Sequence, residues 1–281
     1  MIFWNKRTIN KLLKLKRGGM TNIEIAEKLG TSRQAVKGKL GRLRKKVDAR
    51  AKKDGHITVR ANKCIVISDL HIPRVNMKAI DNACRAGKRY HITTLILGGD
   101  VFDFDSFSRF DRVTKSDLAA EIAMAKDIFV RLRKQFKQIY VVTGNHDTRI
   151  ARLLLFDIGF AGFMKSININ AIVTNNSWLK LISGGKEFIV AHASAYSSIA
   201  GRVANNLAHR KNTNIMIGHS HNANVTVTPN GKFVAIDLGM CGDPTQFTYK
   251  TSRVNAFPEW QNAYAIVING LVRLVIDGLT F

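Results

Sequence analysis

Short apolar runs rich in β-branched residues alternate with longer amphipathic segments beyond residue 61. Runs of this kind are typical of buried strands, whereas apolar residues at every third or fourth position indicate helices. The pattern predicts strands at 64–68, 93–99, 138–144, 187–193 and 214–220, and helices at 116–136, 148–164 and 199–209. This alternation of strands and helices is typical of an α/β fold.

The last third of the chain changes character. The stretch NVTVTPNGKFVAIDLG predicts two strands around Pro229-Asn230-Gly231, and AYAIVINGLVRLVI predicts another pair around Asn269-Gly270. Strands joined by such tight turns run antiparallel, so we expect a mixed sheet rather than an all-parallel one.

The first fifty residues predict helices only. Thr8–Arg17 forms a short basic helix that Gly18-Gly19 ends, Thr21 and Glu24 fit a capping box that opens a second helix, and Thr31–Gln34 fits a similar box that opens a third. The expected apolar positions are Ile23, Ile25, Ala26 and Leu29 in the second helix and Ala35, Val36, Leu40 and Leu43 in the third. Two helices joined across Gly30 make a helix-turn-helix.

Composition adds a strong charge asymmetry. The 281 residues include 44 Lys and Arg against 20 Asp and Glu, a formal net charge of +24. Residues 1–63 hold 19 basic and 4 acidic residues, which is +15, and the other 218 residues carry only +9. This imbalance favours a polyanionic partner such as nucleic acid or an anionic membrane surface. We predict a helix-turn-helix domain at 1–55, a linker at 56–62 and a second domain at 63–281.

Other compositional features exclude some classes of protein. No apolar run reaches the length of a membrane-spanning helix, and the N-terminal segment lacks the apolar stretch of a signal peptide. Cys64, Cys84 and Cys241 are odd in number and have no CxxC spacing, which argues against a disulfide framework or a structural zinc site. We therefore expect a cytoplasmic protein without a membrane partner, in a bacterium or a phage-infected cell.

The segment MTNIEIAEKLGTSRQAVKGKL resembles the helix-turn-helix of bacterial and phage regulators, whose helix after the turn enters the DNA major groove. The resemblance implies DNA as a partner. Ser32, Arg33, Gln34 and Lys37 would then face bases or phosphates, with Lys39, Arg42 and Arg44 nearer the DNA backbone. A homodimer would fit this family. The alternative is a helical cap that packs on the rest of the protein or mediates self-association.

Polar clusters follow five of the predicted strands. They are Asp69-Leu70-His71, Gly98-Gly99-Asp100-Val101-Phe102-Asp103, Gly144-Asn145-His146-Asp147, His192, and Gly218-His219-Ser220-His221. Ligand sites of open α/β sheets gather beyond the carboxyl ends of the strands, so these clusters can converge. Carboxylate, imidazole and amide ligands together suit Mn, Fe, Ni or Zn better than calcium or a structural zinc ion. The sequence therefore predicts a transition-metal site.

This set of motifs resembles the calcineurin-like metallophosphoesterase superfamily over residues 63–281. The resemblance implies a four-layer α/β/β/α sandwich with two divalent metal ions, for which we expect Mn²⁺, with Fe, Zn or Ni as alternatives. Asp69, His71 and His221 match the ligands of one metal, Asn145, His192 and His219 match those of the other, and Asp100 matches the bridging carboxylate. His146 matches the catalytic histidine that binds no metal, and Asp103 the acid that orients it.

Two further residues near these motifs are candidates for catalysis. Asp147 can orient a neighbouring ligand, and Arg149 can clamp a phosphate oxygen, as arginine forks often do. The alternative for both residues is a surface ion pair at the start of the following helix.

The two resemblances together suggest a substrate. The superfamily includes protein phosphatases, nucleotide phosphodiesterases and DNA nucleases, so the fold alone names none. A basic helix-turn-helix recruits a catalyst to DNA, which favours a DNA phosphodiesterase of phage type, a nuclease or nickase, acting through a hydroxide activated by two metals. One alternative is a phosphomonoesterase for DNA ends, nucleotides or proteins. The other is a DNA-binding regulator or packaging accessory with little catalysis.

Overall fold

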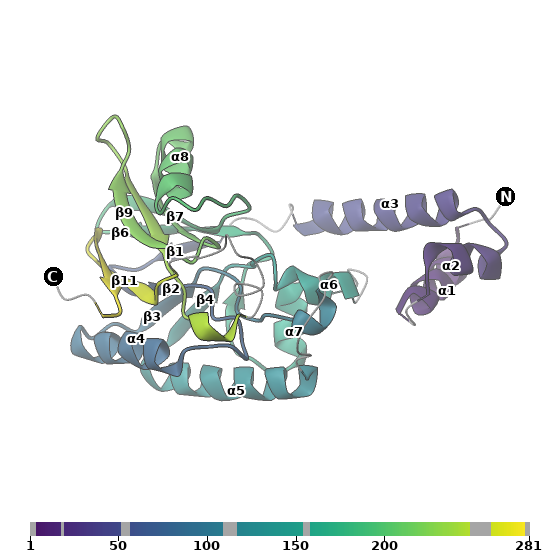
Figure 1. Cartoon of the computed structure of the whole chain (residues 1–281), viewed down its shortest axis with the longest axis horizontal. Coiled ribbons are helices and arrows are strands. Elements are labelled where there is room, and N and C mark those ends of the chain that lie inside the picture. Colours follow the sequence, from purple (N-terminus) through teal and green to yellow (C-terminus); the bar gives the residue numbers. More distant parts are fainter. Residues whose placement is uncertain are drawn as a thin grey trace.

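Two six-stranded sheets stand face to face at the centre of the computed structural model (Figure 1). The structure describes residues 4–17, 20–51, 57–108, 117–153, 158–247 and 260–278. Sheet A has the order β1 (Thr58–Arg60), β6 (Trp178–Ser183), β7 (Lys186–His192), β8 (Asn214–Gly218), β10 (Val234–Leu238) and β9 (Ala223–Val227). Sheet B has the order β12 (Leu271–Ile276), β11 (Ala263–Ile268), β2 (Lys63–Ile67), β3 (Thr94–Leu97), β4 (Gln138–Val141) and β5 (Ile172–Val173).

Both sheets are mixed, as predicted. Strands β2 to β5 of sheet B run parallel, β11 is antiparallel to β2, and β12 is antiparallel to β11. In sheet A, β7, β8 and β10 run parallel, and β6 and β9 are antiparallel to their neighbours β7 and β10. The parallel strands bring their carboxyl ends, and the polar clusters that follow them, to one edge of each sheet.

Alternating side chains of the central strands build separate hydrophobic layers. In β2, Cys64 and Val66 lie in the core between the two sheets, whereas Ile65 and Ile67 lie in the core under the helices of sheet B. Both faces of the strand are buried, which explains its continuous apolar run. These helices are α4 (Met77–Arg89), α5 (Leu118–Gln135) and α7 (Phe160–Ser166), and α8 (Arg202–Lys211) covers sheet A. The predicted α/β/β/α sandwich is confirmed.

Three local predictions need correction. The helix expected over 148–164 is divided into α6 (Thr148–Leu153) and α7, because Ile158 and Gly159 are not helical and Gly159 caps α7. Helix α8 begins at Arg202 instead of residue 199, after Gly201 in a left-handed conformation. Residues 58–60 of the expected linker form β1, which pairs in parallel with β6 and so belongs to the sandwich. Of the other linker residues, 57, 61 and 62 are described and residue 56 lies outside the described residues.

Three helices precede the sandwich and lie apart from it in Figure 1: α1 (Lys6–Arg17), α2 (Asn22–Leu29) and α3 (Arg33–Ala51). They share a small core of Leu12, Ile25, Ala26 and Val36. The predicted capping box at Thr21 and Glu24 is confirmed. The box expected at Thr31–Gln34 is wrong by one residue, because the Ser32 hydroxyl accepts the amide hydrogen of Ala35 at 3.1 Å. Ile23, expected to be apolar core, is 52% exposed.

None of the described helices is both long enough and apolar enough to cross a membrane.

Candidate metal centre

Five strand ends bring their polar clusters to one place between the two sheets. Asp69 and His71 follow β2, Asp100 and Asp103 follow β3, and Asn145 and His146 follow β4, all from sheet B. His192 ends β7, and His219 and His221 follow β8, both from sheet A. The site therefore lies where the carboxyl ends of the parallel strands of the two sheets meet.

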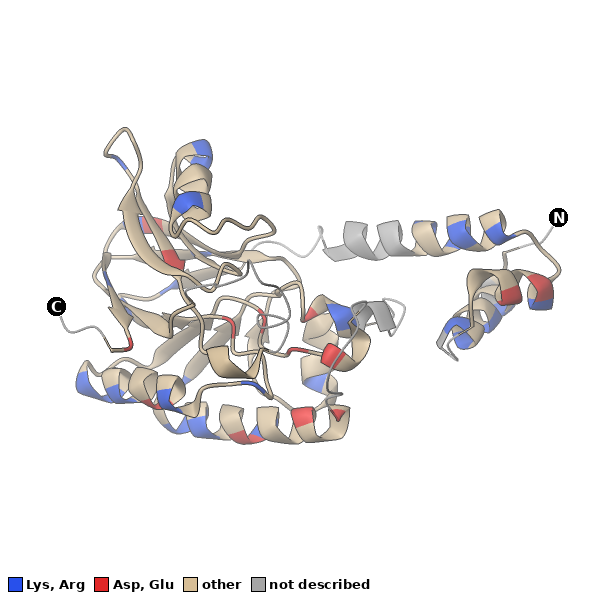
Figure 2. Cartoon of the chain, viewed as in Figure 1, with Lys and Arg blue, Asp and Glu red and all other residues tan. Residues whose placement is uncertain are grey.

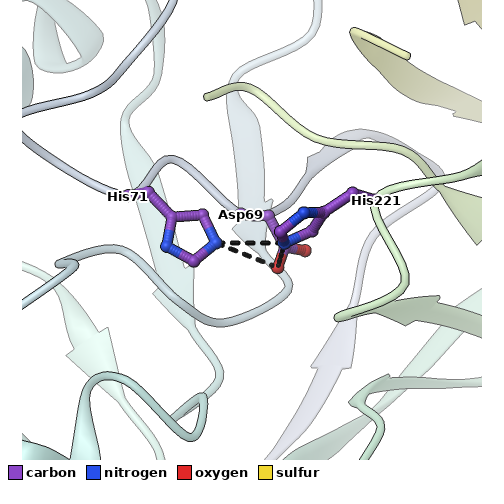
Figure 3. A group of neighbouring side chains, drawn as sticks. All are labelled: Asp69, His71 and His221. Atoms are coloured by element: carbon purple, nitrogen blue, oxygen red, sulfur yellow. Dashed lines mark hydrogen bonds and ion pairs between the residues drawn. The ribbon is translucent and has the colours of Figure 1, made fainter. Parts of the chain in front are cut away.

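The first cluster consists of Asp69, His71 and His221 (Figure 3). The Nε2 atoms of His71 and His221 lie 3.1 Å apart, and both point to the same carboxylate oxygen, Oδ1 of Asp69, at 3.6 and 3.2 Å. The other oxygen of Asp69 accepts hydrogen bonds from the Ser68 hydroxyl at 2.5 Å and from the His219 amide at 3.0 Å. Three buried ligand atoms thus converge on one point, which fits a divalent cation.

The second cluster contains Asp100, His192 and His219, whose ligand atoms lie within 4.8 Å of one another. Nε2 of His192 lies 3.2 Å from Oδ2 of Asp100 and 2.9 Å from the amide oxygen of Asn145. Its Nδ1 lies 3.1 Å from the carbonyl oxygen of Gly98, so Nδ1 carries a proton and Nε2 is the nitrogen that would bind a cation.

Asp100 connects the two clusters. Its Oδ2 lies 3.2 Å from Nε2 of His192 in the second cluster and 3.9 Å from Nε2 of His71 in the first. Its Oδ1 accepts the amide hydrogen of His146 at 2.8 Å, which holds the carboxylate in this orientation. One carboxylate oxygen is therefore within reach of both clusters.

The charge states of the buried groups favour cations at these positions. Burial opposes the charge of Asp69, but the imidazoles of His221 and His71 outweigh it and hold the pKa of Asp69 well below its usual range. His192 and His146 lower the pKa of Asp100 in the same way against its burial. Burial also opposes a charge on His192, yet Asp100 raises the pKa of His192 to about 9. A proton on His192 neutralises Asp100 here, and a bound cation would displace it.

A glycine allows the two sheets to approach at this site. A Cβ atom on Gly218 would lie 2.5 Å from Oδ2 of Asp69, which is closer than any side chain tolerates. Only glycine lets the end of β8 pass next to the carboxylate that follows β2.

His146 lies beside the clusters and pairs with Asp103. Nδ1 of His146 lies 2.6 Å from Oδ1 of Asp103, and Nε2 lies 3.0 Å from Nη2 of Arg149. Because a guanidinium group only donates, Nε2 accepts this bond and Nδ1 donates to Asp103. Burial lowers the pKa of His146 to about 3, so the imidazole is neutral here, and not the imidazolium that a proton donor needs.

A third group of possible ligands, His71, Asp103 and His146, does not fit a cation. Two guanidinium groups already occupy the space around Asp103: Nη1 of Arg74 pairs with Oδ2 of Asp103, and Nη1 of Arg149 lies 3.6 Å from Oδ1. A third positive charge at this point would be repelled.

Comparison with known proteins agrees with this geometry. Residues 63–254 match the model of the calcineurin-like phosphoesterase superfamily domain. The chain belongs to this superfamily. No match was found among curated proteins.

Several solved structures resemble the chain at low sequence identity. The phosphoesterase Yfce from E. coli is 13% identical, with a TM-score of 0.44 over 75% of this chain and 90% of that protein. Vps29 from Chaetomium thermophilum is 13% identical, with a TM-score of 0.40 over 77% and 96%. A predicted phosphoesterase from Streptococcus pneumoniae is 15% identical, with a TM-score of 0.34 over 76% and 97%.

Asp147 holds together two of the loops that form the candidate metal centre. It is fully buried, and its carboxylate accepts the amide hydrogens of Phe102 at 3.1 Å and Gly144 at 2.9 Å. Burial raises the pKa of Asp147 to about 7. The residue is no part of a surface ion pair. It joins the loop after β3 to the loop that carries Asn145 and His146.

Three further residues lie around the candidate metal centre. They are Arg149, and Asp237 and Arg74, which the sequence analysis did not single out. Arg149 donates to the carbonyl oxygen of Asp103 at 2.7 Å, so it is held by the protein itself in this structure. Asp237 of β10 accepts hydrogen bonds from the Ser220 hydroxyl at 2.7 Å and from the Gly201 amide at 3.0 Å, which ties down the loop of His219 and His221. A carboxylate inside the apolar run FVAIDLG was a signal for this role. No comparable signal marks Arg74.

The residues predicted to contact DNA lie mostly on one part of the surface. Ser32, Arg33, Gln34 and Lys37 line a single depression at the start of α3, although Ser32 also caps the helix. Lys39 lies 5.7 Å from the ring centre of Trp4, and Arg42 is exposed. The side chain of Arg44 lies outside the described residues.

Proposed function

We propose that this chain is a metal-dependent phosphodiesterase that acts on DNA, as a nuclease or nickase. The observation that carries the proposal is the position of Asp100, whose Oδ2 is within 3.9 Å of histidines from both clusters, with the pair of His146 and Asp103 beside it. Two adjacent cation sites next to an imidazole are suited to the hydrolysis of a phosphate ester.

Two divalent cations would bind at the two clusters. Asp69, His71 and His221 would hold one, Asn145, His192 and His219 the other, and Asp100 would touch both. Carboxylate, imidazole and amide ligands suit Mn, Fe, Zn or Ni, and of these we expect Mn²⁺. When bound, such ions neutralise phosphate oxygens and lower the pKa of water.

The chain's own residues would then handle the substrate and the proton. Arg149 turns from His146 to a phosphate oxygen, for which its fork is suited. This releases Nε2 of His146, which takes up a proton from solvent and passes it to the leaving oxygen, while Asp103 keeps the imidazole oriented through Nδ1. The contact of Arg149 with His146 thus marks the state before substrate binds.

Charge and shape support DNA as the substrate. The exposed side chains of Arg33, Gln34 and Lys37 share one face of α3, which follows α2 across a Gly-containing turn. Figure 2 shows Lys and Arg on this helix and on α4, α5 and α8 around the sandwich. Lysine and arginine side chains that meet phosphates supply most of the affinity for DNA.

Cleavage assays test the proposal. Metal-free full-length protein is incubated with supercoiled plasmid and with labelled single- and double-stranded oligonucleotides, with Mn²⁺, Mg²⁺, Zn²⁺ or Ni²⁺ added back. We expect cleavage only with metal, and a loss of about 100-fold or more in His146→Ala. His209→Ala, which removes an exposed histidine of α8, is the matched control. DNA cleavage that survives Asp100→Asn or His71→Ala contradicts the proposal.

A phosphomonoesterase is the second candidate, since the same ligand set serves both reactions. Hydrolysis of bis(p-nitrophenyl) phosphate is compared with that of p-nitrophenyl phosphate. Intact DNA together with faster hydrolysis of the monoester would replace the diesterase by this candidate. DNA binding without hydrolysis of any ester would favour a regulator or packaging accessory.

A further inference from the structure

Arg74 connects two acidic side chains of the loop after β3. It lies between β2 and α4, five residues beyond Asp69, and its side chain is 14% exposed. Nη1 pairs with Oδ2 of Asp103, and Nη2 donates to Oδ2 of Asp105 at 2.7 Å. One guanidinium group therefore binds two carboxylates at once, as its planar fork allows.

The remaining oxygen of Asp103 faces the site. Oδ1 lies 2.6 Å from Nδ1 of His146 and 3.5 Å from Nδ1 of His71. The two oxygens of this carboxylate thus have separate partners: Arg74 pairs with Oδ2, and His146 bonds to Oδ1. The rotation of the carboxylate decides whether Oδ1 faces the imidazoles, and the bond to Arg74 determines that rotation.

Arg74 is itself held firmly. Its carbonyl oxygen accepts the amide hydrogen of Asp243 at 2.6 Å, and its guanidinium lies 5.8 Å from the ring centre of Phe247. The Phe247 ring packs edge-on against His71, with ring centres 5.3 Å apart. Arg149 does not replace Arg74, because its short bond, 2.7 Å, goes to the carbonyl oxygen of Asp103.

We propose that Arg74 is a positioning residue of the hydrolytic reaction, which holds Asp103 so that one of its carboxylate oxygens orients His146. The inference rests on the proposed function for its effect on rate. The orientation of His146 by Asp103, which the inference also predicts, can be measured in the absence of catalysis.

Kinetics with bis(p-nitrophenyl) phosphate and saturating Mn²⁺ test the effect on rate. We expect Arg74→Gln to lower kcat by about 10- to 100-fold, as the loss of partners behind metal and catalytic groups usually does, with KM changed by less than about twofold. Arg74→Lys should lose less, because an ammonium group can still pair with Asp103 but not with both carboxylates. This variant also serves if Arg74→Gln does not fold.

A double-mutant cycle separates positioning from a general loss of structure. If Arg74 acts through Asp103, Arg74→Gln should cost little further activity in an Asp103→Asn background. Arg131→Gln is the matched control, because Arg131 also pairs with an aspartate, Asp81, but on the outer helices α4 and α5. It should keep wild-type kcat.

Nuclear magnetic resonance of metal-free protein with ¹⁵N-labelled histidine gives a readout that needs no activity. In wild type and Arg131→Gln, we expect the proton on Nδ1 of His146 to be protected from exchange by Asp103. In Arg74→Gln and Asp103→Asn it should exchange faster than in wild type, because the Asp103 carbonyl oxygen, 3.1 Å away, is then its main remaining partner.

Two results overturn the proposal: an unchanged Nδ1 proton in Arg74→Gln, or losses of kcat that simply add in the double variant. If wild type hydrolyses no ester with any metal, the proposed function fails, and the Nδ1 proton still decides whether Arg74 positions His146.

Discussion

At the scale of single residues, the site is built from unfavourable backbone conformations. Five of the seven proposed metal ligands adopt a left-handed backbone, with φ from 48° to 94°: Asp69, His71, Asp100, His219 and His221. Such a conformation costs about 1–3 kcal/mol for a residue other than glycine. The surrounding hydrogen bonds, such as those to Asp100 and Asp69, compensate for it and point the ligand atoms at one another.

Glu121 is another residue in an unfavourable environment, because its carboxyl group is buried. It is fully buried in α5, and its Oε1 accepts the amide hydrogen of Phe104, which is also left-handed, at 2.8 Å. Burial raises the pKa of Glu121 from 4.5 to about 7. Between these pH values the folded protein keeps a proton that the unfolded chain loses, so Glu121 lowers the free energy of unfolding as pH rises.

Glu121→Gln should remove this pH dependence, because glutamine can accept the Phe104 bond without a charge. We expect the variant to gain stability relative to wild type as pH rises from about 4.5 to 7, by up to about 3 kcal/mol. Urea unfolding of metal-free protein at several pH values measures the difference. Glu187→Gln, at an exposed position of β7, is the control. A difference that does not change with pH would contradict the role given to Glu121.

At the scale of elements, the turn between α2 and α3 depends on one glycine. Gly30 has a left-handed backbone, with φ of 62°, and its amide hydrogen bonds to carbonyl oxygens of the last turn of α2. A Cβ atom at Gly30 would meet nothing within 4 Å, and the same holds for Gly38 inside α3. The two positions therefore differ in backbone conformation and not in the space available to a Cβ atom.

The same substitution should have opposite effects at these two glycines. Gly30→Ala should destabilise the helical domain by about 1 kcal/mol, because alanine resists the left-handed conformation. Gly38→Ala should stabilise it by about 0.5–1 kcal/mol, because alanine favours a helix. Amide hydrogen exchange in α2 and α3 of the full chain reports both. Equal effects of the two variants would show that the turn does not need glycine.

At the scale of the whole molecule, charge is unevenly distributed over two parts. Residues 1–63 carry +15 of the net charge of +24, and the helices of the sandwich also present Lys and Arg to solvent (Figure 2). If α3 binds DNA as proposed, its basic side chains displace cations that are bound to the DNA phosphates. The affinity for DNA should therefore fall as the salt concentration rises.

Affinity for a double-stranded oligonucleotide, measured by fluorescence anisotropy in EDTA at several salt concentrations, tests this proposal. Arg33→Ala and Lys37→Ala should each weaken binding and reduce the slope of log K against log salt by about 1. Arg85→Ala, an exposed arginine of α4, should leave the slope unchanged. A slope that responds to Arg85 but not to Arg33 would place DNA on the sandwich helices instead.

Local patterns in the sequence determined much of this protein. The box of Thr21 and Glu24, the antiparallel turns of the last third and the buried run of β2 depend on neighbouring residues, and all appear as predicted. The polar motifs also followed from the sequence, because each comes directly after its strand. Where a local signal was weak, as at Ile158 and Gly159, the prediction of one continuous helix was wrong.

Only the tertiary structure decided which motifs touch. Asp69 and His221 lie 152 residues apart in the chain and meet because β2 and β8 belong to facing sheets. The same packing turned Asp147 inward to two backbone amides and brought Arg74 to Asp103. These contacts depend on the order of strands and on the paths of loops, which nearby residues do not encode. Local patterns therefore pointed to the proposed metal ligands, and packing identified the residues that orient them.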